Sequence, residues 1–337
     1  MLTDGNIEQA SARIRAIQYI PLLEKSGYEV QLIPRVPNKP LNLFSTLIVF
    51  PIIKRILWMK RMFAIFFKTW DIVFIQRIFI PKWAMQKLHA KTAIIFDFDD
   101  AIFINDRNPS AMIKTSTMIK FSKEIIISTK ILNDFCLKQK RKGIIIPTPV
   151  EKERIMPVSK DNHKIPTIGW IGSNWTTDYL KIIEPVLQKL SKELSFKFLT
   201  IGSRPDFRIP QIDHISEPWS YECENSYIGE MDIGIMPLPN NDFARAKGGY
   251  KIYLYMAGGI PIVASAVGIN QEIIRNNENG FLASNEDEWY LALKNLLSDR
   301  LLRNKLGKVG RIDVEKYYDR AVCFKKLSAI IDQSVKK

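Results

Sequence analysis

The sequence predicts an α/β protein of two domains, each built around a parallel sheet. Its 337 residues exceed what one hydrophobic core usually serves, which favours two domains. Short apolar runs alternate with helical patterns along the chain, as expected for parallel strands joined by crossover helices. Apolar residues make up 46% and charged residues 25% of the chain, a composition typical of a folded globular protein.

The first half contains one clear helical pattern and four strand-like runs. Residues 11–25 carry apolar side chains at helical spacing, and Gly27 follows as a stop signal. Strands are expected at residues 29–33, 71–76, 93–96 and 124–128. Residues 1–10 hold no buried-strand run, although a doubly wound domain normally opens with a strand. Either the chain starts late, which we favour, or its first strand is degenerate.

A break in the pattern separates the two halves. Pro147 and Pro149 interrupt it, and the polar residues 151–164 follow, so we place the linker there. In the second half, strands are expected at residues 167–171, 196–201, 232–236 and 261–264, helices at 177–190 and 250–257, and amphipathic helices from residue 286 onward. This gives an N-terminal domain over residues 1–155 and a C-terminal domain over residues 162–319.

Positive charge is concentrated in the first half. The net charge is +14, and residues 1–150 contain 23 Lys and Arg against 11 Asp and Glu, whereas residues 151–337 contain 26 against 24. A basic half fits anionic lipid or nucleic acid, and the near-neutral half fits a small-molecule domain. The basic residues are mixed with many apolar ones and match no nucleic-acid motif, so we expect no nucleic-acid partner.

Cysteine and histidine usage indicates a reducing compartment. The three cysteines and three histidines are scattered, which argues against a zinc site and against a disulfide framework. The N-terminus lacks the basic, apolar, small-residue order of a signal peptide. We therefore expect a cytoplasmic protein.

Residues 41–68 combine aromatic and aliphatic side chains with five basic ones. A spanning helix needs about 20 uninterrupted apolar residues, and Pro51 with the Lys54–Arg55 pair interrupts this stretch. We favour a basic amphipathic segment that lies in the membrane interface. The alternative is a buried helix pair whose lysines reach outward to solvent. The first interpretation predicts peripheral attachment to an anionic membrane, on the inner face of the plasma membrane.

A long ordered run of motifs lies between Asp242 and Leu282. It contains Lys251, Tyr255-Met256-Ala257, Gly259, Pro261-Ile262-Val263-Ala264-Ser265, Val267-Gly268-Ile269-Asn270, Glu272-Ile273 and Asn279-Gly280-Phe281-Leu282. This run resembles the donor-site segment of the group-1 glycosyltransferases, the large retaining family (family four) with a GT-B fold. The segments Ile168–Ser173 and, in one subgroup, Ser11–Arg15 and Phe96–Phe103 are also similar to the family.

The resemblance implies two Rossmann-like domains that face each other across a cleft. The C-terminal domain would bind a nucleotide-sugar donor, the N-terminal one a glycan or lipid-linked acceptor, and a final helix over residues 320–337 would pack back on the N-terminal domain. Transfer would retain the anomeric configuration, with the departing phosphate oxygen accepting the proton of the acceptor hydroxyl. No cofactor and no metal are implied, because the nucleotide-sugar is a substrate. Bacterial cell-surface polysaccharide synthesis is the expected setting.

The chain departs from the family at two positions. Many relatives carry two glutamates, eight positions apart, that contact the sugar and the ribose; aligned on Tyr255-Met256-Ala257, these positions are Ala246 and Leu254. Neither residue is acidic, so these contacts cannot be carried over. The departure keeps open a second hypothesis, a non-catalytic relative that binds sugar nucleotide or polysaccharide.

Basic residues before the expected helix at 250–257 suggest a diphosphate site. Lys247 and Lys251 flank Gly248-Gly249, whose lack of side chains lets the backbone approach a phosphate. Cations oppose the dipole at a helix N-terminus, so their placement there points to an anionic ligand. We assign Lys247 a catalytic role in stabilising the leaving group, and Gly248, Gly249 and Lys251 to donor binding. A simple helix cap with a solvated basic start is the alternative.

Further candidates lie after expected strands and on the first helix. Gly172-Ser173-Asn174 and Arg204 follow strands at the edge where open α/β sheets bind ligands, so we assign them to the donor, with plain turns as the alternative. Arg13 is assigned a catalytic role, in contact with the diphosphate or an anionic acceptor, with a surface arginine as the alternative. Asp97 and Asp99 share one strand face, and we place Asp99 and Asp100 on the acceptor side rather than at a metal.

Overall fold

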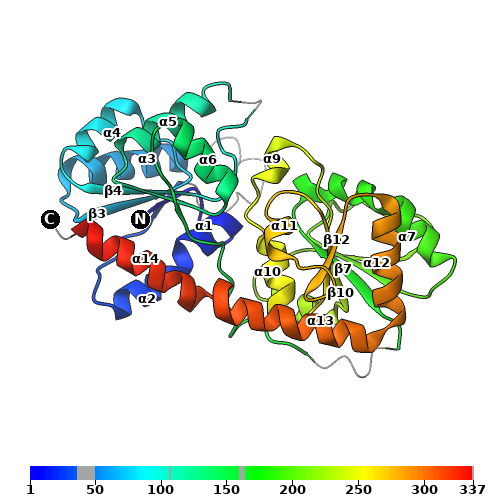
Figure 1. Ribbon diagram of the computed structural model, residues 1–337. Coiled ribbons are helices and arrows are strands. Elements are labelled where there is room, and N and C mark those ends of the chain that lie inside the picture. Colours follow the sequence, from blue (N-terminus) through cyan, green and yellow to red (C-terminus); the bar gives the residue numbers. More distant parts are fainter. Residues whose placement is uncertain (36–49, 106–107, 159–163, 336–337) are drawn as a thin grey trace. The chain divides into compact units, whose positions relative to one another are not determined.

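The computed structural model describes residues 1–35, 50–105, 108–158 and 164–335, and it divides into two compact units (Figure 1). Unit 1 comprises Met1–Thr148, Ala246–Gly248 and Ala321–Lys337, and unit 2 comprises Pro149–Arg245 and Gly249–Arg320. Each unit contains a six-stranded sheet whose paired strands are all parallel. The prediction of two Rossmann-like domains is therefore confirmed.

The sheet of unit 1 has the strand order β2-β1-β3-β4-β5-β6. Its strands are β1 (Leu2–Thr3), β2 (Ile33–Pro34), β3 (Ile72–Gln76), β4 (Ala93–Phe98), β5 (Glu124–Ile127) and β6 (Ile144–Ile145). The central strands β3, β4 and β5 are buried along almost their whole length. This is why they read as continuous apolar runs in the sequence rather than as alternating patterns.

Helices cover both faces of this sheet. On one face lie α3 (Phe50–Phe67), α4 (Lys82–His89), α5 (Ala111–Phe121) and α6 (Lys130–Lys138); on the other lie α1 (Ala10–Arg15), the 3₁₀ helix Ile17–Tyr19, α2 (Ile20–Lys25) and α14 (Arg320–Val335) (Figure 1). Two separate buried clusters of apolar side chains fill these two layers. In the second cluster, Cys323 and Leu327 of α14 pack with Tyr19.

The first strand is present, although the sequence offered no signal for it. β1 consists of Leu2 and Thr3 only, and it pairs with both β2 and β3. Both residues are buried. Two residues are too few to form a recognisable pattern, so the expectation that the first strand could be missing is corrected: a two-residue strand occupies its place in the sheet.

Two expected helices are broken in the structure. The pattern over residues 11–25 forms three short helices, with Pro21 in the first turn of α2. The pattern over residues 177–190 forms a 3₁₀ helix (Asn174–Ile182) and then α7 (Glu184–Ser191), with Pro185 in its first turn. A proline lacks the N–H that would continue the preceding helix, so each proline begins a new one.

Part of the expected interfacial segment is a helix. Residues 41–49 lie outside the described part of the chain, and α3 covers the remainder up to Phe67. Met62 and Ile65 of α3 are buried in unit 1, whereas Phe63 and Phe67 are exposed. Within the described ranges, no helix is both long and apolar enough to cross a bilayer.

The sheet of unit 2 has the order β12-β11-β10-β7-β8-β9. Its strands are β7 (Thr167–Ile171), β8 (Lys197–Ile201), β9 (Asp213–Glu217), β10 (Ile233–Met236), β11 (Ile262–Ser265) and β12 (Gly280–Ala283). The sequence did not predict the outer strands β9 and β12. β9 alternates between exposed and half-buried residues, because an edge strand has less of its surface covered than a central one.

Two apolar layers sandwich the sheet of unit 2. One contains α8 (Glu224–Glu230), α9 (Asp242–Arg245), α10 (Tyr250–Ala257), α11 (Asn270–Ile273) and the π-helical turn Val314–Tyr318; the other contains the 3₁₀ helix, α7, α12 (Glu286–Ser298) and part of α13 (Arg300–Asp313). Figure 1 shows α10 on one side of the sheet and α7 and α12 on the other. α10 has the bounds that the sequence predicted, and its residues from Ile252 to Ala257 are all buried.

Candidate functional site

The sheet of unit 2 has a topological switch point at β7. The chain passes from β7 to β8 on one side, whereas β10 lies on the other. The register pairs β7 with β10 only at Ile168–Ile233 and Gly169–Gly234. The two strands therefore stop pairing before their carboxyl ends, which is the place where open α/β sheets bind ligands.

The hydroxyl of Tyr255 takes the place of the missing ladder bonds. It accepts from the backbone N–H of Ile171 at 3.0 Å and donates to the carbonyl of Ile235 at 3.3 Å. Burial raises the pKa of Tyr255, so the hydroxyl keeps its proton and can donate. The ring of Tyr255 packs on Gly234, where a Cβ atom would lie 2.5 Å from it. α10 thereby holds the strands apart at the switch point.

This contact predicts the effect of Tyr255→Phe. Without the hydroxyl, the N–H of Ile171 and the carbonyl of Ile235 lose their buried partner, so we expect a loss of about 1–3 kcal/mol in the free energy of unfolding. Denaturant titration of both proteins measures it. Tyr290→Phe is the matched control, since that hydroxyl binds Glu193 at an exposed position and its loss should cost about 0.5 kcal/mol or less. Equal effects of the two substitutions would contradict the assigned role.

Lys251, Trp170 and Gly172 meet at the end of β7. The Nζ atom of Lys251 lies over the indole ring of Trp170, 4.2 Å from its centroid. A Cβ atom on Gly172 would lie 2.2 Å from the ring of Trp170 and 2.8 Å from Nζ of Lys251. Position 172 therefore has no room for a side chain, and the ammonium group lies beside the bare backbone after β7. The structure thus brings the predicted residues Gly172 and Lys251 together.

Asn174 joins the loop after β7 to the loop after β8. With its side-chain nitrogen directed at them, it donates to the carbonyls of Gly202 and Ser203 at 3.1 Å each. Ser173 precedes the 3₁₀ helix as its N-cap. Gly202 has φ +72°, and a Cβ atom there would lie 2.5 Å from the carbonyl oxygen of Gly172. These contacts fix the two predicted loops against each other.

The guanidinium of Arg204, in the loop after β8, is bound by a carboxylate of the 3₁₀ helix Asn174–Ile182. It pairs with both carboxylate oxygens of Asp178, at 2.8 and 3.1 Å. These hydrogen bonds lower the pKa of Asp178. The predicted donor contact would therefore compete with an existing bidentate pair.

The predicted Lys247–Lys251 cluster is divided between the units. Lys247 and Gly248 belong to unit 1, and Gly249 and Lys251 belong to unit 2. Gly249 has φ +75° and forms the N-cap of α10, a conformation that favours glycine. Gly248 leaves no room for a side chain either, because a Cβ atom would lie 2.6 Å from the hydroxyl of Thr148.

The two positions that carry glutamate in many relatives are apolar and buried. Ala246 is 1% exposed and belongs to the core of unit 1, and Leu254 is 1% exposed and belongs to the core of unit 2. The departure seen in the sequence is thus a local exchange of acidic ligand contacts for core packing.

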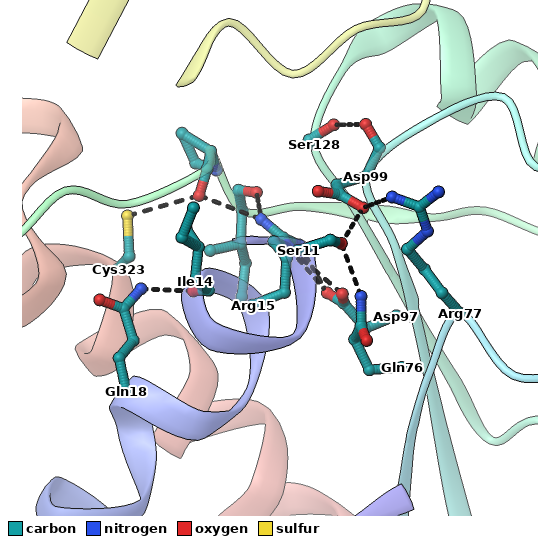
Figure 2. Close-up of polar contacts among 12 residues, drawn as sticks. Ser11, Ile14, Arg15, Gln18, Gln76, Arg77, Asp97, Asp99, Ser128 and Cys323 are labelled. Carbon is teal, nitrogen blue, oxygen red and sulfur yellow. Dashed lines mark hydrogen bonds and ion pairs between the residues drawn. The ribbon is translucent and has the colours of Figure 1, made fainter. Parts of the chain in front are cut away.

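In unit 1, a polar network lies at the carboxyl ends of β3 and β4 (Figure 2). Asp99 accepts from the hydroxyl of Ser11 at 2.7 Å and pairs with Arg77 at 3.3 Å. Arg77 also pairs with Asp100 at 3.0 Å, and Gln76 donates to Ser11 at 2.7 Å. The expected acceptor-side residues Asp99 and Asp100 therefore share one arginine as an ion-pair partner. Among the described residues, no group of His, Cys, Asp or Glu forms a metal site.

The arginines of α1 point inward. Arg13 is 3% exposed, and its guanidinium donates to the carbonyl of Ile7 at 2.8 Å. Arg15 donates to both carboxylate oxygens of Asp97 at distances between 2.5 and 3.2 Å, and to the carbonyl of Ile146 at 2.8 Å (Figure 2). The surface alternative for Arg13 is therefore excluded, and the buried pair Arg15–Asp97 is a contact between α1 and β4.

Sequence reasoning did not single out Trp170, Tyr255 or Arg77 as site residues. Two of them carried a usable signal. Trp170 stands two residues before Gly172 on the same strand face, and Tyr255 stands four residues after Lys251 on the same helix face. Arg77 has no such relation to Asp99, because the pair depends on strand neighbours that the sequence does not specify.

The comparisons with known proteins define the class of this fold. Sucrose-phosphate synthase from Thermosynechococcus elongatus superposes with a TM-score of 0.75 at 15% identity, covering 98% of both chains. A glycosyltransferase from Rickettsia africae gives 0.67 at 18% identity, covering 100% of this chain and 98% of the other. HepE of Anabaena in complex with UDP gives 0.65 at 12% identity, covering 98% of both chains. The fold is that of the GT-B glycosyltransferases.

A match to a protein family covers most of unit 2. Residues 165–299 match the sequence profile of Glycosyl transferases group 1. The matched region contains β7 to β12 and the contacts at the switch point. No curated protein matches the sequence. The match supports a glycosyltransferase as the enzyme class.

Proposed function

We propose that this protein transfers a sugar from a nucleotide-sugar donor to a glycan or lipid-linked acceptor, with retention of configuration, in bacterial cell-surface polysaccharide synthesis. The observation that carries the proposal is the switch-point site, where Lys251 lies beside the bare backbone of Gly172 inside the matched region. Structures of HepE hold UDP and UDP-glucose, which supports a donor of this chemical kind. The enzyme is of the hexosyltransferase type.

The proposed reaction exchanges one bond at the anomeric carbon. The bond from this carbon to the diphosphate oxygen breaks, and a bond to the acceptor oxygen forms. Charge develops on the leaving diphosphate, so groups that stabilise it lower the barrier. The acceptor proton passes to the departing phosphate oxygen. We assign the stabilising charge to Lys251 and Lys247, and the close backbone approach to the loop after β7.

Unit 1 takes the acceptor in this proposal. The ligand edge of such a sheet is usually formed by the carboxyl ends of its strands. Asp99 and Asp100 directly follow β4, and Arg13 lies on α1. We place the protein on the cytoplasmic face of the plasma membrane as a peripheral enzyme. The basic charge of residues 1–150 supports this placement.

A thermal-shift screen tests the donor site. UDP-, GDP-, ADP- and CMP-sugars are added separately to wild type and to Lys247→Ala. A ligand at a hundred times its Kd stabilises the folded state by about 2.7 kcal/mol, so we expect one nucleotide to raise Tm and the substitution to reduce this shift. Lys192→Ala, at an exposed position on unit 2, is the control that should keep it.

Release of the nucleotide, a nucleoside diphosphate from UDP-, GDP- or ADP-sugars and CMP from CMP-sugars, then separates transfer from binding alone. A Tm shift without any release, with water or with added acceptor, would favour the non-catalytic relative that Ala246 and Leu254 suggest. If the folded protein shows no Tm shift with any of the four kinds of nucleotide-sugar, the proposed function is contradicted.

A further inference from the structure

Three neighbouring helices of unit 1 share an unusual outer surface. We call the exposed side of α3, α4 and α5 the basic-apolar face. Together these helices contain seven exposed lysine and arginine residues, besides the buried Arg61, and no aspartate or glutamate. They are neighbours in space, since Phe66 of α3 stacks on Trp83 of α4 at 5.4 Å and both helices, with α5, pack on the same layer of the sheet.

α3 has two apolar sides. Its exposed large apolar residues are Ile52, Ile56, Trp58, Met59, Phe63 and Phe67. All but Trp58 recur at a spacing of three or four residues and form one stripe along the helix. The buried residues Arg61, Met62, Ala64 and Ile65 lie on the opposite side. Helical geometry thus leaves an apolar stripe directed away from unit 1, with Arg55 and Lys60 on its two flanks.

α4 and α5 extend this surface. Trp83 is 55% exposed and Ile113 is 70% exposed. A groove of about 540 Å³ runs along α5, bordered by Lys82 at the start of α4 and by Gln139 and Arg141 after α6 (Lys130–Lys138). Its lining includes Lys82 and Lys120, the hydroxyl side chains of Ser116 and Thr117, and the apolar side chains of Met112 and Ile113. The groove therefore offers positive charge and hydroxyl groups beside apolar side chains.

The combination of basic and exposed apolar side chains favours an anionic bilayer over a nucleic acid as the partner of this face. A nucleic acid needs positive charge but leaves exposed aliphatic side chains such as Ile113 in water. A bilayer with anionic headgroups meets both needs, because lysines contact the phosphates while apolar side chains enter the acyl boundary. The absence of acidic residues removes the like-charge repulsion that would oppose such a surface.

We propose that the basic-apolar face binds an anionic phospholipid bilayer, with Trp83 and Ile113 inserted and a lipid headgroup seated in the groove between Lys82 and Lys120. This inference names the surface for the membrane attachment in the proposed function and rests on that attachment. It does not depend on sugar transfer.

Vesicle sedimentation tests the charge requirement. The full chain is mixed with vesicles of phosphatidylcholine alone, or of phosphatidylcholine with an equal part of phosphatidylglycerol. We expect binding to the anionic vesicles only, weakened by salt. Each surface lysine contributes about five-fold to the partition constant, so Lys60→Gln, Lys82→Gln and Lys120→Gln together should reduce it about a hundred-fold. Lys192, Lys305 and Lys308 changed to Gln remove the same charge from exposed positions of unit 2 and should leave it unchanged.

Quenching by brominated acyl chains tests insertion. Tryptophan fluorescence should fall on binding to brominated anionic vesicles, and Trp83→Phe should remove most of that fall, whereas Trp58→Phe, outside the apolar stripe, should leave it. Equal binding to neutral vesicles, an equal loss in the two lysine triples, or quenching that survives Trp83→Phe would overturn the proposal. Self-association or duplex DNA binding through this face, without vesicle binding, would assign it to a second copy or to nucleic acid. A retained donor Tm shift in these variants keeps this test separate from that of the donor site.

Discussion

Lys251→Gln is expected to lower kcat about a hundred- to a thousand-fold with a much smaller change in KM. The ammonium lies beside the backbone of Gly172 and over the ring of Trp170, where it faces the proposed leaving diphosphate. Charge on that group grows as the glycosidic bond breaks, so the lysine contributes more in the transition state than in the bound donor. Loss of one such preorganised group typically costs about this factor. Release of nucleoside diphosphate, with the donor found in the thermal-shift screen, is the measurement.

Lys189→Gln is the matched control for this experiment. Its Nζ atom lies over the ring of Tyr290 at 4.1 Å from the centroid, so it has the same type of contact away from the switch point. The control should keep wild-type turnover. If Lys251→Gln also keeps it, or changes KM alone, the charge at this position serves ground-state binding or packing, and the assignment of Lys251 fails.

The sequence predicted the central strands well and the margins poorly. β7 and α10 have the predicted bounds because each is long, buried and flanked by turn signals. β1 and β6 are two residues long, so no periodic pattern can form in them. β9 lies at an edge and carries polar residues along most of its length. The sequence pattern therefore predicts an element when several consecutive residues are buried. It gives no signal where a strand is defined only by its pairing with a neighbour.

The candidate site shows the same limit for side chains. Gly172 and Lys251 were found because a bare turn after a strand and a cation at a helix start each have a local reason. Their contact through Trp170 needs the sheet order. For Arg204 the sequence pattern gave no indication of an existing partner, because Asp178 lies 26 positions earlier in the chain. Residue type and position thus predict what a side chain can do, whereas its existing partners appear only with the fold.

Asp97→Asn is expected to destabilise unit 1 by about 3–5 kcal/mol. Asp97 and Arg15 are 1% and 2% exposed and are joined by three hydrogen bonds. Burial raises the pKa of Asp97 to about 6, which outweighs the lowering effect of Arg15. At pH 7 the pair is therefore ionic, and the neutral amide leaves a buried guanidinium without its counter-charge, which is costly. Calorimetry and denaturant titration of the two proteins measure the change in the free energy of unfolding.

Two further variants separate the cost of removing one partner of this ion pair from the net stabilisation that the intact pair gives to the fold. Asp178→Asn makes the same change in a bidentate pair whose partners are 52% and 35% exposed, so it should leave the free energy of unfolding almost unchanged. Arg15→Met with Asp97→Leu removes both buried charges, so it should regain much of the loss from Asp97→Asn, because paired burial gains little over apolar packing. The recovery should stay incomplete, since the carbonyl of Ile146 then lacks the donor it has in Arg15. A double variant as unstable as the single one would show instead that the ion pair itself holds α1 on β4.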